Sequence, residues 1–520
     1  MSGLISPKAR FRALLAATVA AALGLGACAN QPQNLRLTAD PRKQTFDHNY
    51  LFSAYIKARG ARHAIPAYPI IVTMSGGGTR ATALAADVIR ELRAFKRNGH
   101  PLTDDIIVVS GTSGGSFAAT AFAVYANKPE EFDQFYDQFV VRRDKTDALA
   151  GALLVPWKWN YLATNRTAAL AKLLDDRLQL DDARFAILSD PTSWGQRPFL
   201  ILNSTDFGAG APFVFNQYYF SLICSDLNQY PLALATAAAG AFPFLLSDVE
   251  LENLRDAGAP CLVPPTKPPM SGLERFAAID QLRHQRYAYD ISHAFDPQAD
   301  PPSSRPRVQW LHLFDGGLVD NMGIRSAADL FTDKTIKRLV EEAPERTIPA
   351  MLHILINARD NTPAPMDLEQ GSPGWVTVAE NVVFEPIDTT SDLSAWGIQN
   401  YMAELFAVAS KTDYPQTYRT VQIDFDLLDL SVPQNRTLRD RAAGSELLTQ
   451  LDITDTQRNA IEKIAHILLV GNPCFQDYVV TTNVELPGKF DSESDKGCTV
   501  VKPGKSLPPQ PVPFLEEMEE

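Results

Sequence analysis

The chain has 520 residues, of which 45% are hydrophobic and 21% are charged. This composition is typical of a globular protein with a large core, and it excludes a chain that is disordered over most of its length. The formal net charge is −13, which argues against a nucleic-acid partner and against binding to anionic lipid surfaces by charge alone, because both select basic proteins.

The first 27 residues have the pattern of a targeting segment. A basic start precedes the apolar stretch ALLAATVAAALGLGA, which is too short to span a bilayer. It ends in Leu25-Gly26-Ala27-Cys28, which resembles the lipobox of bacterial lipoproteins. The resemblance implies that Cys28 is acylated and anchors the mature protein to a membrane. Because no aspartate follows Cys28, analogy with lipoprotein sorting indicates the outer membrane; a plain secretory peptide is the alternative.

The five cysteines fit one lipidated residue and four that can pair. If Cys28 carries lipid, the other four lie in an oxidising compartment, where two disulfides are allowed. The sequence does not choose among their three connectivities. Pairing between neighbours in the chain is our working prediction, Cys224 with Cys261 and Cys474 with Cys498. No metal-ligand spacing such as C-x-x-C occurs, and we expect neither a metal nor another cofactor.

After a polar tether and lead-in over residues 28–60, strand and helix patterns alternate. Residues 68–74 predict a buried strand and residues 79–97 an amphipathic helix, and residues 105–111 and 115–126 repeat this order. Further strands are predicted at residues 198–205, 308–315, 350–358 and 420–428. This alternation predicts an α/β fold with a mostly parallel central sheet and helices on both faces.

Segments without this alternation suggest the domain limits. The main domain is predicted over residues 61–360, with insertions near residues 126–195, which look helical, and near residues 250–306, which are rich in proline and charge. Residues 361–484 are predicted to be a C-terminal extension packed on the main domain. Residues 485–520 are rich in proline and charge, and we expect a disordered tail there.

Ser113 lies in Gly111-Thr112-Ser113-Gly114-Gly115, at a predicted strand-to-helix turn. This G-x-S-x-G pattern is typical of a nucleophile elbow, in which glycine avoids clashes in a sharp turn. The N-terminus of the following helix would favour negative charge beside the hydroxyl. Glycine-rich turns are also common architecture, so the motif alone leaves both the catalytic and the structural interpretation open.

Gly76, Gly77 and Gly78 follow the first predicted strand and expose consecutive backbone N–H groups before a helix, an arrangement that binds anions. A dinucleotide site requires an acidic residue at the end of the next strand, and that strand ends without one. A Walker loop is excluded because no G-K-[ST] follows these glycines. The three glycines are therefore predicted to form an oxyanion hole.

Asp315 ends the predicted strand at residues 308–315 and precedes two glycines. In an open parallel sheet, sites form at the carboxyl ends of the strands, so we expect the Asp315 carboxylate at that edge. An aspartate that only caps a helix or a turn is the alternative.

Together the three motifs resemble those of the patatin-like phospholipase family, which has a glycine-rich oxyanion motif, a G-x-S-x-G motif and a D-G-[GA] motif in this order. Softer similarity occurs at residues 203–210 and 235–243, and the resemblance covers roughly residues 66–360. Two residues depart from the pattern: Ser75 stands where many members carry aspartate, and Ala81 where many carry glycine.

The resemblance implies a patatin-like fold, in a bacterial lipoprotein form, and a serine hydrolase that cleaves ester bonds of phospholipids or lysophospholipids. Ser113 would be the nucleophile and Asp315 its base, in a dyad without histidine. The N–H groups of Gly76, Gly77 and Gly78 would stabilise the oxyanion.

The flanking residues receive supporting roles from the same resemblance. Gly111 and Gly115 would shape the nucleophile elbow. Arg80 would support the glycine loop or contact a lipid phosphate.

A catalytic triad would require a histidine at a strand-end loop. His353 falls within a predicted strand, His466 within an amphipathic helix, and His312 within the strand that ends at Asp315. The dyad is therefore our prediction. Two other functions remain open: a carboxylesterase with the same dyad that acts on soluble or neutral-lipid esters, and a non-catalytic, lipid-anchored binding protein.

Overall fold

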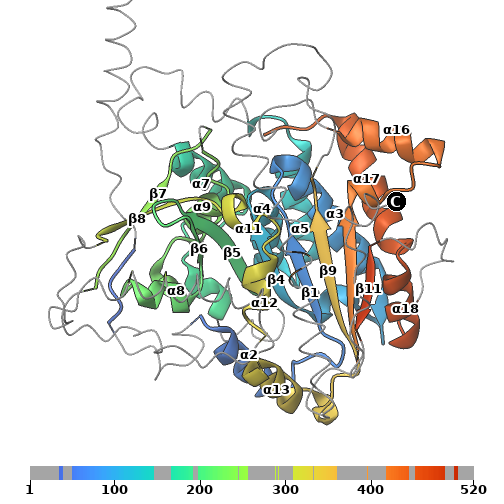
Figure 1. The fold of residues 1–520 in the computed structure, drawn as a ribbon, viewed down its shortest axis with the longest axis horizontal. Coiled ribbons are helices and arrows are strands. Elements are labelled where there is room, and N and C mark those ends of the chain that lie inside the picture. Colours follow the sequence, from blue (N-terminus) through green and yellow to red (C-terminus); the bar gives the residue numbers. More distant parts are fainter. Residues whose placement is uncertain are drawn as a thin grey trace, which may run out of the picture.

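The computed structural model describes residues 34–38, 50–145, 166–190, 197–243, 245–255, 287, 291, 308–331, 333–359, 395, 397, 417–443, 451–485 and 497–501. Within these ranges nine strands form one sheet in the order β11-β10-β9-β1-β4-β5-β8-β7, with β6 paired to β5 (Figure 1). The strands are β1 (Ile70–Met74), β4 (Ile106–Thr112), β5 (Phe199–Asp206), β6 (Ala211–Val214), β7 (Val249–Glu252), β8 (Trp310–Asp315), β9 (Met351–Asn357), β10 (Tyr418–Asp424) and β11 (Cys498–Val501). A separate hairpin pairs β2 (Lys96–Arg97) with β3 (His100–Pro101).

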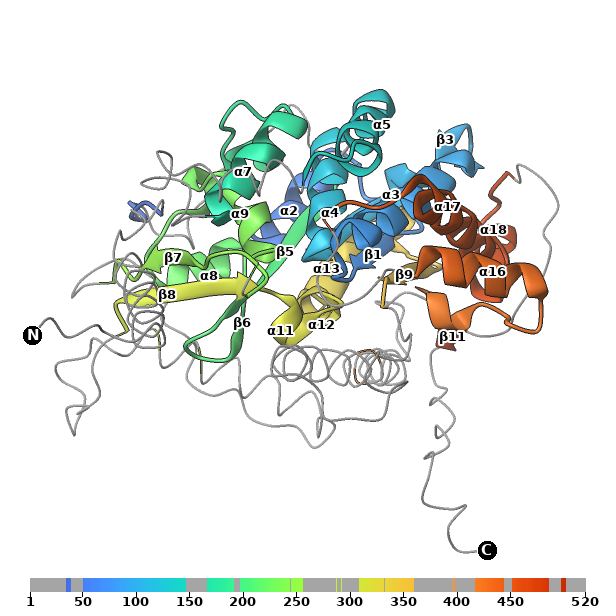
Figure 2. The ribbon, with the colours of Figure 1, turned by 90° about the horizontal axis from the view of Figure 1, so that it is seen from above.

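Helices lie on both sides of this sheet. They are α2 (Phe52–Gly60), α3 (Gly78–Ala94), α4 (Gly114–Tyr125), α5 (Pro129–Tyr136), α7 (Arg166–Arg177), α8 (Gln217–Leu222), α9 (Leu232–Ala239), α11 (Gly317–Asp320), α12 (Ile324–Ala328), α13 (Asp333–Glu342), α16 (Pro433–Ala442), α17 (Asp455–Val470) and α18 (Pro473–Thr481). Figure 2 shows α3, α4, α9 and α17 on one side of the strands and α11 and α12 on the other. Both α4 and α12 pack against β4 and β5.

The five central strands β10, β9, β1, β4 and β5 run parallel to one another. Every residue of β1, β4, β5 and β9 is buried, which explains why these strands appear as continuous apolar runs without polar alternation. The predicted fold class, a mostly parallel sheet with helices on both faces, is confirmed. The strands predicted from the sequence correspond to β1, β4, β5, β8, β9 and β10.

The direction of β8 differs from the prediction. This strand runs antiparallel to β5 and pairs with its last three residues, so that Asp315 lies opposite Ser204 and Leu313 opposite Asp206. Asp315 therefore reaches the carboxyl edge of the parallel strands from an antiparallel neighbour. Sequence periodicity reports which residues of a strand are buried, but it does not report the direction of the strand in the sheet.

Two predicted boundaries are corrected by the structure. Tyr50 is fully buried, and α2 packs against α13, so residues 50–60 belong to the core rather than to a tether. Cys498–Val501 forms β11 beside β10, although we expected the tail from residue 485 to be disordered. A disulfide between Cys474 and Cys498 fastens this edge strand to α18.

That disulfide confirms one of the two pairings taken as the working prediction. Cys224 is disulfide-bonded too, but its predicted partner Cys261 lies outside the described residues. Cys28, the whole targeting segment and most of the insertion at residues 250–306 also lie outside them. Within the described ranges, every helix is too short or too polar to span a bilayer.

Candidate active site

Ser113 occupies a strained turn between β4 and α4. Its backbone adopts φ 50° and ψ −128°, and a positive φ is unfavourable for a residue that carries a Cβ. Such strain persists only where the surrounding structure enforces it, and it is concentrated at functional sites. Ser113 is 6% exposed, and α4 begins at the next residue, so the positive end of the helix dipole favours negative charge at this hydroxyl.

The glycines flanking Ser113 leave no room for side chains. A Cβ at Gly111 would lie 2.6 Å from the Cα of Ser116, and a Cβ at Gly115 would lie 2.4 Å from the carbonyl oxygen of Met74. These neighbours are backbone atoms, which cannot move aside as the end of a flexible side chain can. The close approach of β1, β4 and α4 therefore depends on glycine at both positions.

The glycine-rich loop after β1 packs directly against the serine turn. A Cβ at Gly114 would lie 1.9 Å from the carbonyl oxygen of Gly78. The Thr82 hydroxyl donates to the carbonyl oxygen of Gly114 at 2.8 Å and lies 3.2 Å from that of Gly78. The two loops thus form one unit, which places the first turn of α3 beside Ser113.

The loop glycines differ in whether their N–H groups are available. The Gly76 N–H donates to the main-chain oxygen of Asn321 at 2.9 Å and to its Oδ1 at 3.1 Å. This engagement removes Gly76 from the expected oxyanion hole. The N–H groups of Gly77 and Gly78 have no acceptor among the described residues, and both backbones have positive φ, 132° and 61°. These two groups are the candidate oxyanion donors.

Asp315 presents a buried carboxylate at the same edge of the sheet. It is 2% exposed, and its Oδ1 accepts a hydrogen bond of 2.8 Å from the Gly317 N–H. Its Oδ2 is buried and has no hydrogen-bond partner among the described residues. A buried carboxylate oxygen without a donor is costly, so this atom is poised to accept a proton.

The register of the sheet brings Ser113 to Asp315. Thr112 lies opposite Asn203 on β5, and Asp315 lies opposite the next residue, Ser204. Burial raises the pKa of Asp315 to about 6, while the nearby Ser113 hydroxyl and the Gly317 N–H lower it. The hydroxyl is thus close enough to influence the carboxylate, although the two do not form a hydrogen bond of ordinary geometry.

Arg80 lies in the first turn of α3, and its side chain extends toward the C-terminal extension. Its guanidinium carbon is 5.8 Å from the centroid of the Phe425 ring, which follows β10. A cation over an aromatic face at this distance is a favourable packing contact. This contact favours the interpretation in which Arg80 supports the glycine loop.

The histidines weighed for a triad lie in other surroundings. His353 is buried in β9, with its ring 3.1 Å from the Thr73 hydroxyl and 2.8 Å from the Tyr418 hydroxyl. Burial lowers its pKa to about 4, so the ring is neutral at physiological pH. His466 is an exposed residue of α17, and its ring lies 3.1 Å from Glu91.

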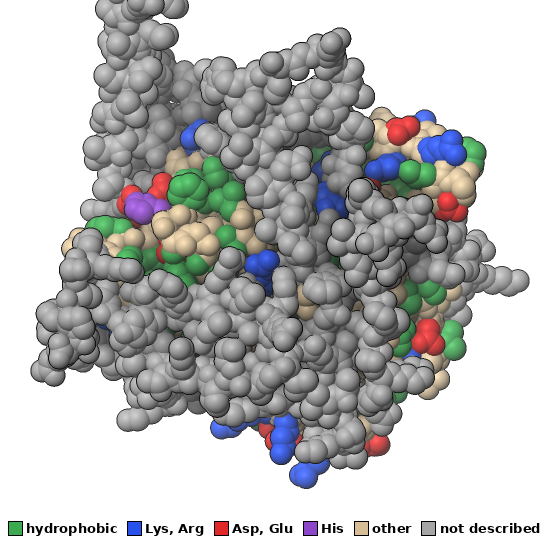
Figure 3. Space-filling view, viewed as in Figure 1, with side chains coloured by type: hydrophobic (Ala, Val, Ile, Leu, Met, Phe, Trp, Pro, Cys, Tyr) green, Lys and Arg blue, Asp and Glu red, His purple; other side chains and the backbone are tan. Residues whose placement is uncertain are grey.

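His312 lies on β8, next to the edge strand β7, and its side chain is exposed. Its Nδ1 is 2.6 Å from Asp248 Oδ2 and 3.9 Å from Glu250 Oε1. Figure 3 shows a surface histidine (purple) beside acidic side chains (red). These carboxylates hold the ring on strands β7 and β8, and no hydrogen bond or ion pair joins it to Ser113.

An apolar pocket opens beside Ser113. The pocket is narrow in this structure, with a cavity volume of about 20 Å³. Its apolar walls include Phe117, Phe139, Leu170, Phe242 and Leu451. Phe117 follows the serine motif and Phe242 lies in residues 235–243, but no pattern in these regions indicated a pocket wall. Phe139, Leu170 and Leu451 come from distant segments that belong to no motif. An apolar pocket beside a candidate nucleophile is suited to bind the hydrocarbon part of a substrate.

Residues 72–328 match the family model described as patatin-like phospholipase. Among curated proteins, none matches this chain. The solved structures with some similarity include human GIVD cytosolic phospholipase A2, with 12% identity, a TM-score of 0.40, and coverage of 88% of this chain and 68% of that chain.

Two bacterial structures are also similar. VipD from Legionella pneumophila has 11% identity and a TM-score of 0.27, and covers 77% of this chain and 67% of that chain. The heterodimeric ExoU-SpcU complex from the type III secretion system of Pseudomonas aeruginosa has 15% identity, a TM-score of 0.22, and coverage of 85% and 83%. The family assignment rests on the match to the family model, because these structural likenesses are weak.

Proposed function

Residues 72–328 form a patatin-like phospholipase domain, and we propose that this lipid acyl hydrolase cleaves carboxylic ester bonds of phospholipids or lysophospholipids with a Ser113–Asp315 dyad. One observation carries the assignment of the dyad. The strained Ser113 lies beside a buried carboxylate whose Oδ2 has no hydrogen-bond partner among the described residues. This proximity supports the assignment, because a nucleophile and its base must come within hydrogen-bond reach once substrate is bound.

In the first half of the reaction, the Ser113 Oγ attacks the ester carbonyl carbon while Asp315 takes the hydroxyl proton. Negative charge develops on the carbonyl oxygen, and the N–H groups of Gly77 and Gly78 would stabilise it. The tetrahedral intermediate then collapses, its bond to the alcohol breaks, and Asp315 returns the proton to the leaving oxygen. The product is an acyl group esterified to Ser113.

In the second half, water attacks the acyl-enzyme and Asp315 accepts a proton from it. The bond to Ser113 breaks, the hydroxyl regains its proton, and a free fatty acid leaves. The apolar pocket beside Ser113 would hold the acyl chain throughout. For Asp315, a pKa of about 6 suits this role, because the carboxylate is ionised at neutral pH yet is more basic than an ordinary aspartate.

The proposal is tested by labelling and by substrate profiling of the purified mature protein. A fluorophosphonate probe should label wild type at Ser113, and hydrolysis should be measured on phospholipids, lysophospholipids and short soluble esters. Turnover confined to short esters would replace the phospholipid substrate by that of a carboxylesterase. Neither labelling nor turnover in folded protein would favour a non-catalytic binding protein.

We also propose that the mature protein is anchored to a membrane, specifically the outer membrane, through an acylated Cys28. The Leu25-Gly26-Ala27-Cys28 motif after a basic and apolar segment supports this proposal. The net charge of −13 provides no electrostatic attraction to anionic lipid, so the acyl group would have to supply the membrane affinity. Such an anchor would hold the enzyme close to its lipid substrate.

A further inference from the structure

One wall of the active-site pocket comes from outside the phospholipase domain. Leu451 lines the same cavity as Ser113 and Gly78, yet it precedes α17 in the C-terminal extension and lies beyond residues 72–328. The Thr79 hydroxyl, in the first turn of α3, donates a hydrogen bond to the main-chain oxygen of Leu451. Thr79, which follows Gly78 in the chain, thus holds Leu451 against the candidate oxyanion loop.

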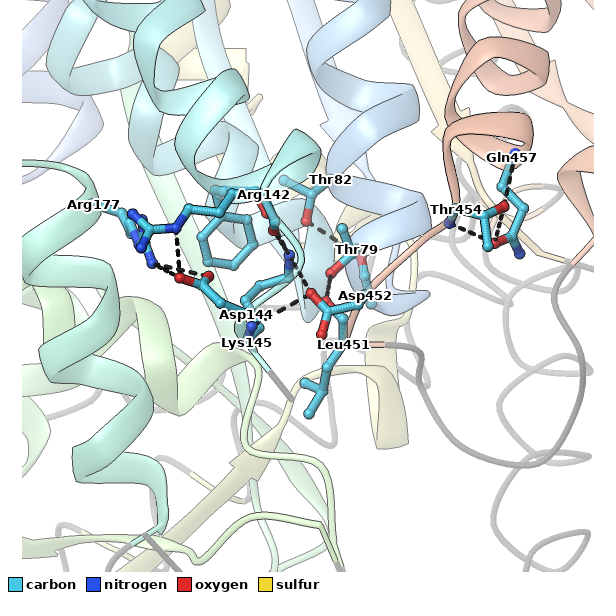
Figure 4. A network of polar contacts seen from close by, with 12 residues as sticks. Thr79, Thr82, Arg142, Asp144, Lys145, Arg177, Leu451, Asp452, Thr454 and Gln457 are labelled. Carbon is cyan, nitrogen blue, oxygen red and sulfur yellow. Dashed lines mark hydrogen bonds and ion pairs between the residues drawn. The ribbon is translucent and has the colours of Figure 1, made fainter. Parts of the chain in front are cut away.

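An ion pair between a buried lysine and a partly buried aspartate holds the same segment from the opposite side. The Lys145 Nζ lies 2.9 Å from Asp452 Oδ1, and the Lys145 backbone N–H donates to the same oxygen at 3.4 Å. Figure 4 shows Lys145 and Thr79 on either side of the chain at Leu451 and Asp452. Leu451 and Asp452, which are adjacent in the chain, are therefore both fixed. Leu451 is held through its main-chain oxygen and Asp452 through its carboxylate.

Lys145 has no donor left for a substrate. It is 2% exposed, and its ammonium group donates to the main-chain oxygens of Phe139 and Arg142 as well as to Asp452. An ammonium group has three N–H donors, and these three acceptors use all of them. Although Lys145 lines the pocket, it serves as an attachment point for the wall rather than as a ligand for an anionic headgroup.

The segment that carries Lys145 is itself held by ion pairs. Asp144 pairs with Arg177 of α7 through two contacts of 2.8 and 2.9 Å, and α7 packs against α9. A second ion pair, Arg143 with Asp455, joins the same two segments at 2.7 Å, but both of its side chains are exposed. Exposed pairs contribute little, whereas removal of one partner from a buried pair is costly. The Lys145–Asp452 pair is thus the stronger connection.

We propose that Leu451 determines which acyl groups the enzyme accepts, and that the Lys145–Asp452 pair holds it in position. This inference rests on the proposed function and adds a specificity-determining residue to it. The Leu451 side chain is half-buried and faces the pocket that would hold the acyl chain. A smaller side chain should lengthen or widen the pocket, and a larger one should shorten it.

The test compares p-nitrophenyl palmitate with p-nitrophenyl butyrate in the full-length mature protein. Leu451→Ala should raise the ratio of kcat/KM for the long ester to that for the short ester by about tenfold, and Leu451→Trp should lower it by a similar factor. Leu438→Ala is the matched control, since this half-buried leucine of the same extension does not line the pocket. It should leave the ratio unchanged.

The two aspartates of the segment test the attachment. Asp452→Ala should change the ratio because the wall loses its buried partner, whereas Asp455→Ala, which breaks the exposed pair, should not. Fluorophosphonate labelling of Ser113 and the thermal unfolding curve show whether each variant is folded with an assembled site.

The outcomes separate this inference from the function on which it rests. If wild type is neither labelled nor active on any ester, the proposed function fails. If wild type is labelled and active, but folded Leu451→Ala and Leu451→Trp both keep its chain-length ratio, only the role of Leu451 is refuted. Equal effects of Asp452→Ala and Asp455→Ala would refute the role of the Lys145–Asp452 pair.

Discussion

Ser113 and Asp315 are attached to the same turn of the chain, because the Ser113 N–H donates to the carbonyl oxygen of Ala239 at 2.9 Å and the Asp315 N–H donates to that of Ala241 at 3.0 Å. This turn follows α9, which packs against β5 and β8. The candidate nucleophile after β4 and the candidate base at the end of the antiparallel strand β8 are thus both fixed to the turn after α9. Preorganisation of this kind keeps reacting groups in position before substrate binds.

Replacement of the nucleophile should separate activity from stability. Ser113→Ala should lower ester hydrolysis by at least about a thousandfold, since catalysis without a nucleophile retains only ~10³–10⁴ over water. Its thermal stability should match that of wild type, because alanine and serine suffer the same strain at φ 50°. Ser113→Gly should be equally inactive but more stable than Ser113→Ala by about 1 kcal/mol, because glycine tolerates this backbone. Turnover near wild type in Ser113→Ala would refute the assignment.

The contact between the two glycine loops should be essential. Gly114→Ala would place a Cβ 1.9 Å from the Gly78 carbonyl oxygen, so the loops must separate, at a cost of about 1–3 kcal/mol. We expect loss of fluorophosphonate labelling together with a lower melting temperature. Gly208→Ala is the control, because a Cβ there has its nearest contact at 3.5 Å, with Asp206 Oδ1. Normal labelling of Gly114→Ala would show that the loops need not touch.

Lipidation at Cys28 should control where the protein resides. Cys28→Ser removes the thiol that would be acylated, so the variant should appear as an unprocessed precursor or be released from membranes. Membrane fractionation and mass spectrometry of the mature N-terminus distinguish these states. An unacylated N-terminus in membrane-bound wild type would contradict the proposed anchor.

The elements that the sequence predicted correctly are those with a local signal. β1 and β4 are continuous apolar runs because both of their faces are buried, and α3 shows one apolar face at helical spacing. The turn at Ser113 could be recognised because close backbone approach requires glycine at Gly111, Gly114 and Gly115. In each case the physical constraint acts within a few residues of the chain.

The features that escaped prediction depend on contacts between distant segments. The main-chain oxygen of Asn321 accepts the hydrogen bond of the Gly76 N–H. Leu451 and Lys145 line the pocket although they come from separate segments. The β11 strand forms through pairing with β10, in a segment that we expected to be disordered. None of these contacts has a periodicity or a composition that a single sequence would reveal.

Histidine substitutions should affect stability rather than catalysis. His353 lies opposite Ile71 of β1, and Ile71 lies opposite Val108 of β4, so its ring is about five strand residues, or roughly 16 Å along the sheet, from the level of Ser113. His353→Gln should keep kcat/KM within about tenfold while costing about 1–2 kcal/mol of stability through its buried hydrogen bonds. His312→Gln and His466→Gln should change neither property strongly. A catalytic defect as large as that of Asp315→Asn in any of these folded variants would indicate a triad.

The protonation of Asp315 should govern the pH dependence of activity. The base must be ionised to accept the Ser113 proton, and burial raises the pKa of Asp315 to about 6. The rate should therefore be highest above this pH and fall on acidification through it, tenfold per pH unit once the carboxylate is mostly protonated. The pH profile of kcat/KM reports this pKa in the free enzyme. A profile that stays flat down to about pH 4 would show that the base is another group or that the Asp315 pKa is not raised.

The same pKa shift predicts an unusual gain of stability on removing the charge. Since the folded state binds this proton more tightly than the unfolded chain, ionisation of Asp315 disfavours folding, and wild type should lose stability as the pH rises from about 4 to about 6. A rise in pKa from 3.8 to about 6 corresponds to about 3 kcal/mol. Asp315→Asn keeps the shape of the side chain and its acceptor for the Gly317 N–H but carries no charge. Asp315→Asn should be inactive. In chemical unfolding experiments it should be more stable than wild type above about pH 6, and this difference in stability should vanish below about pH 4. An inactive Asp315→Asn variant that is less stable than wild type at neutral pH would mean that the carboxylate is needed for folding and would leave its role as the base unsupported.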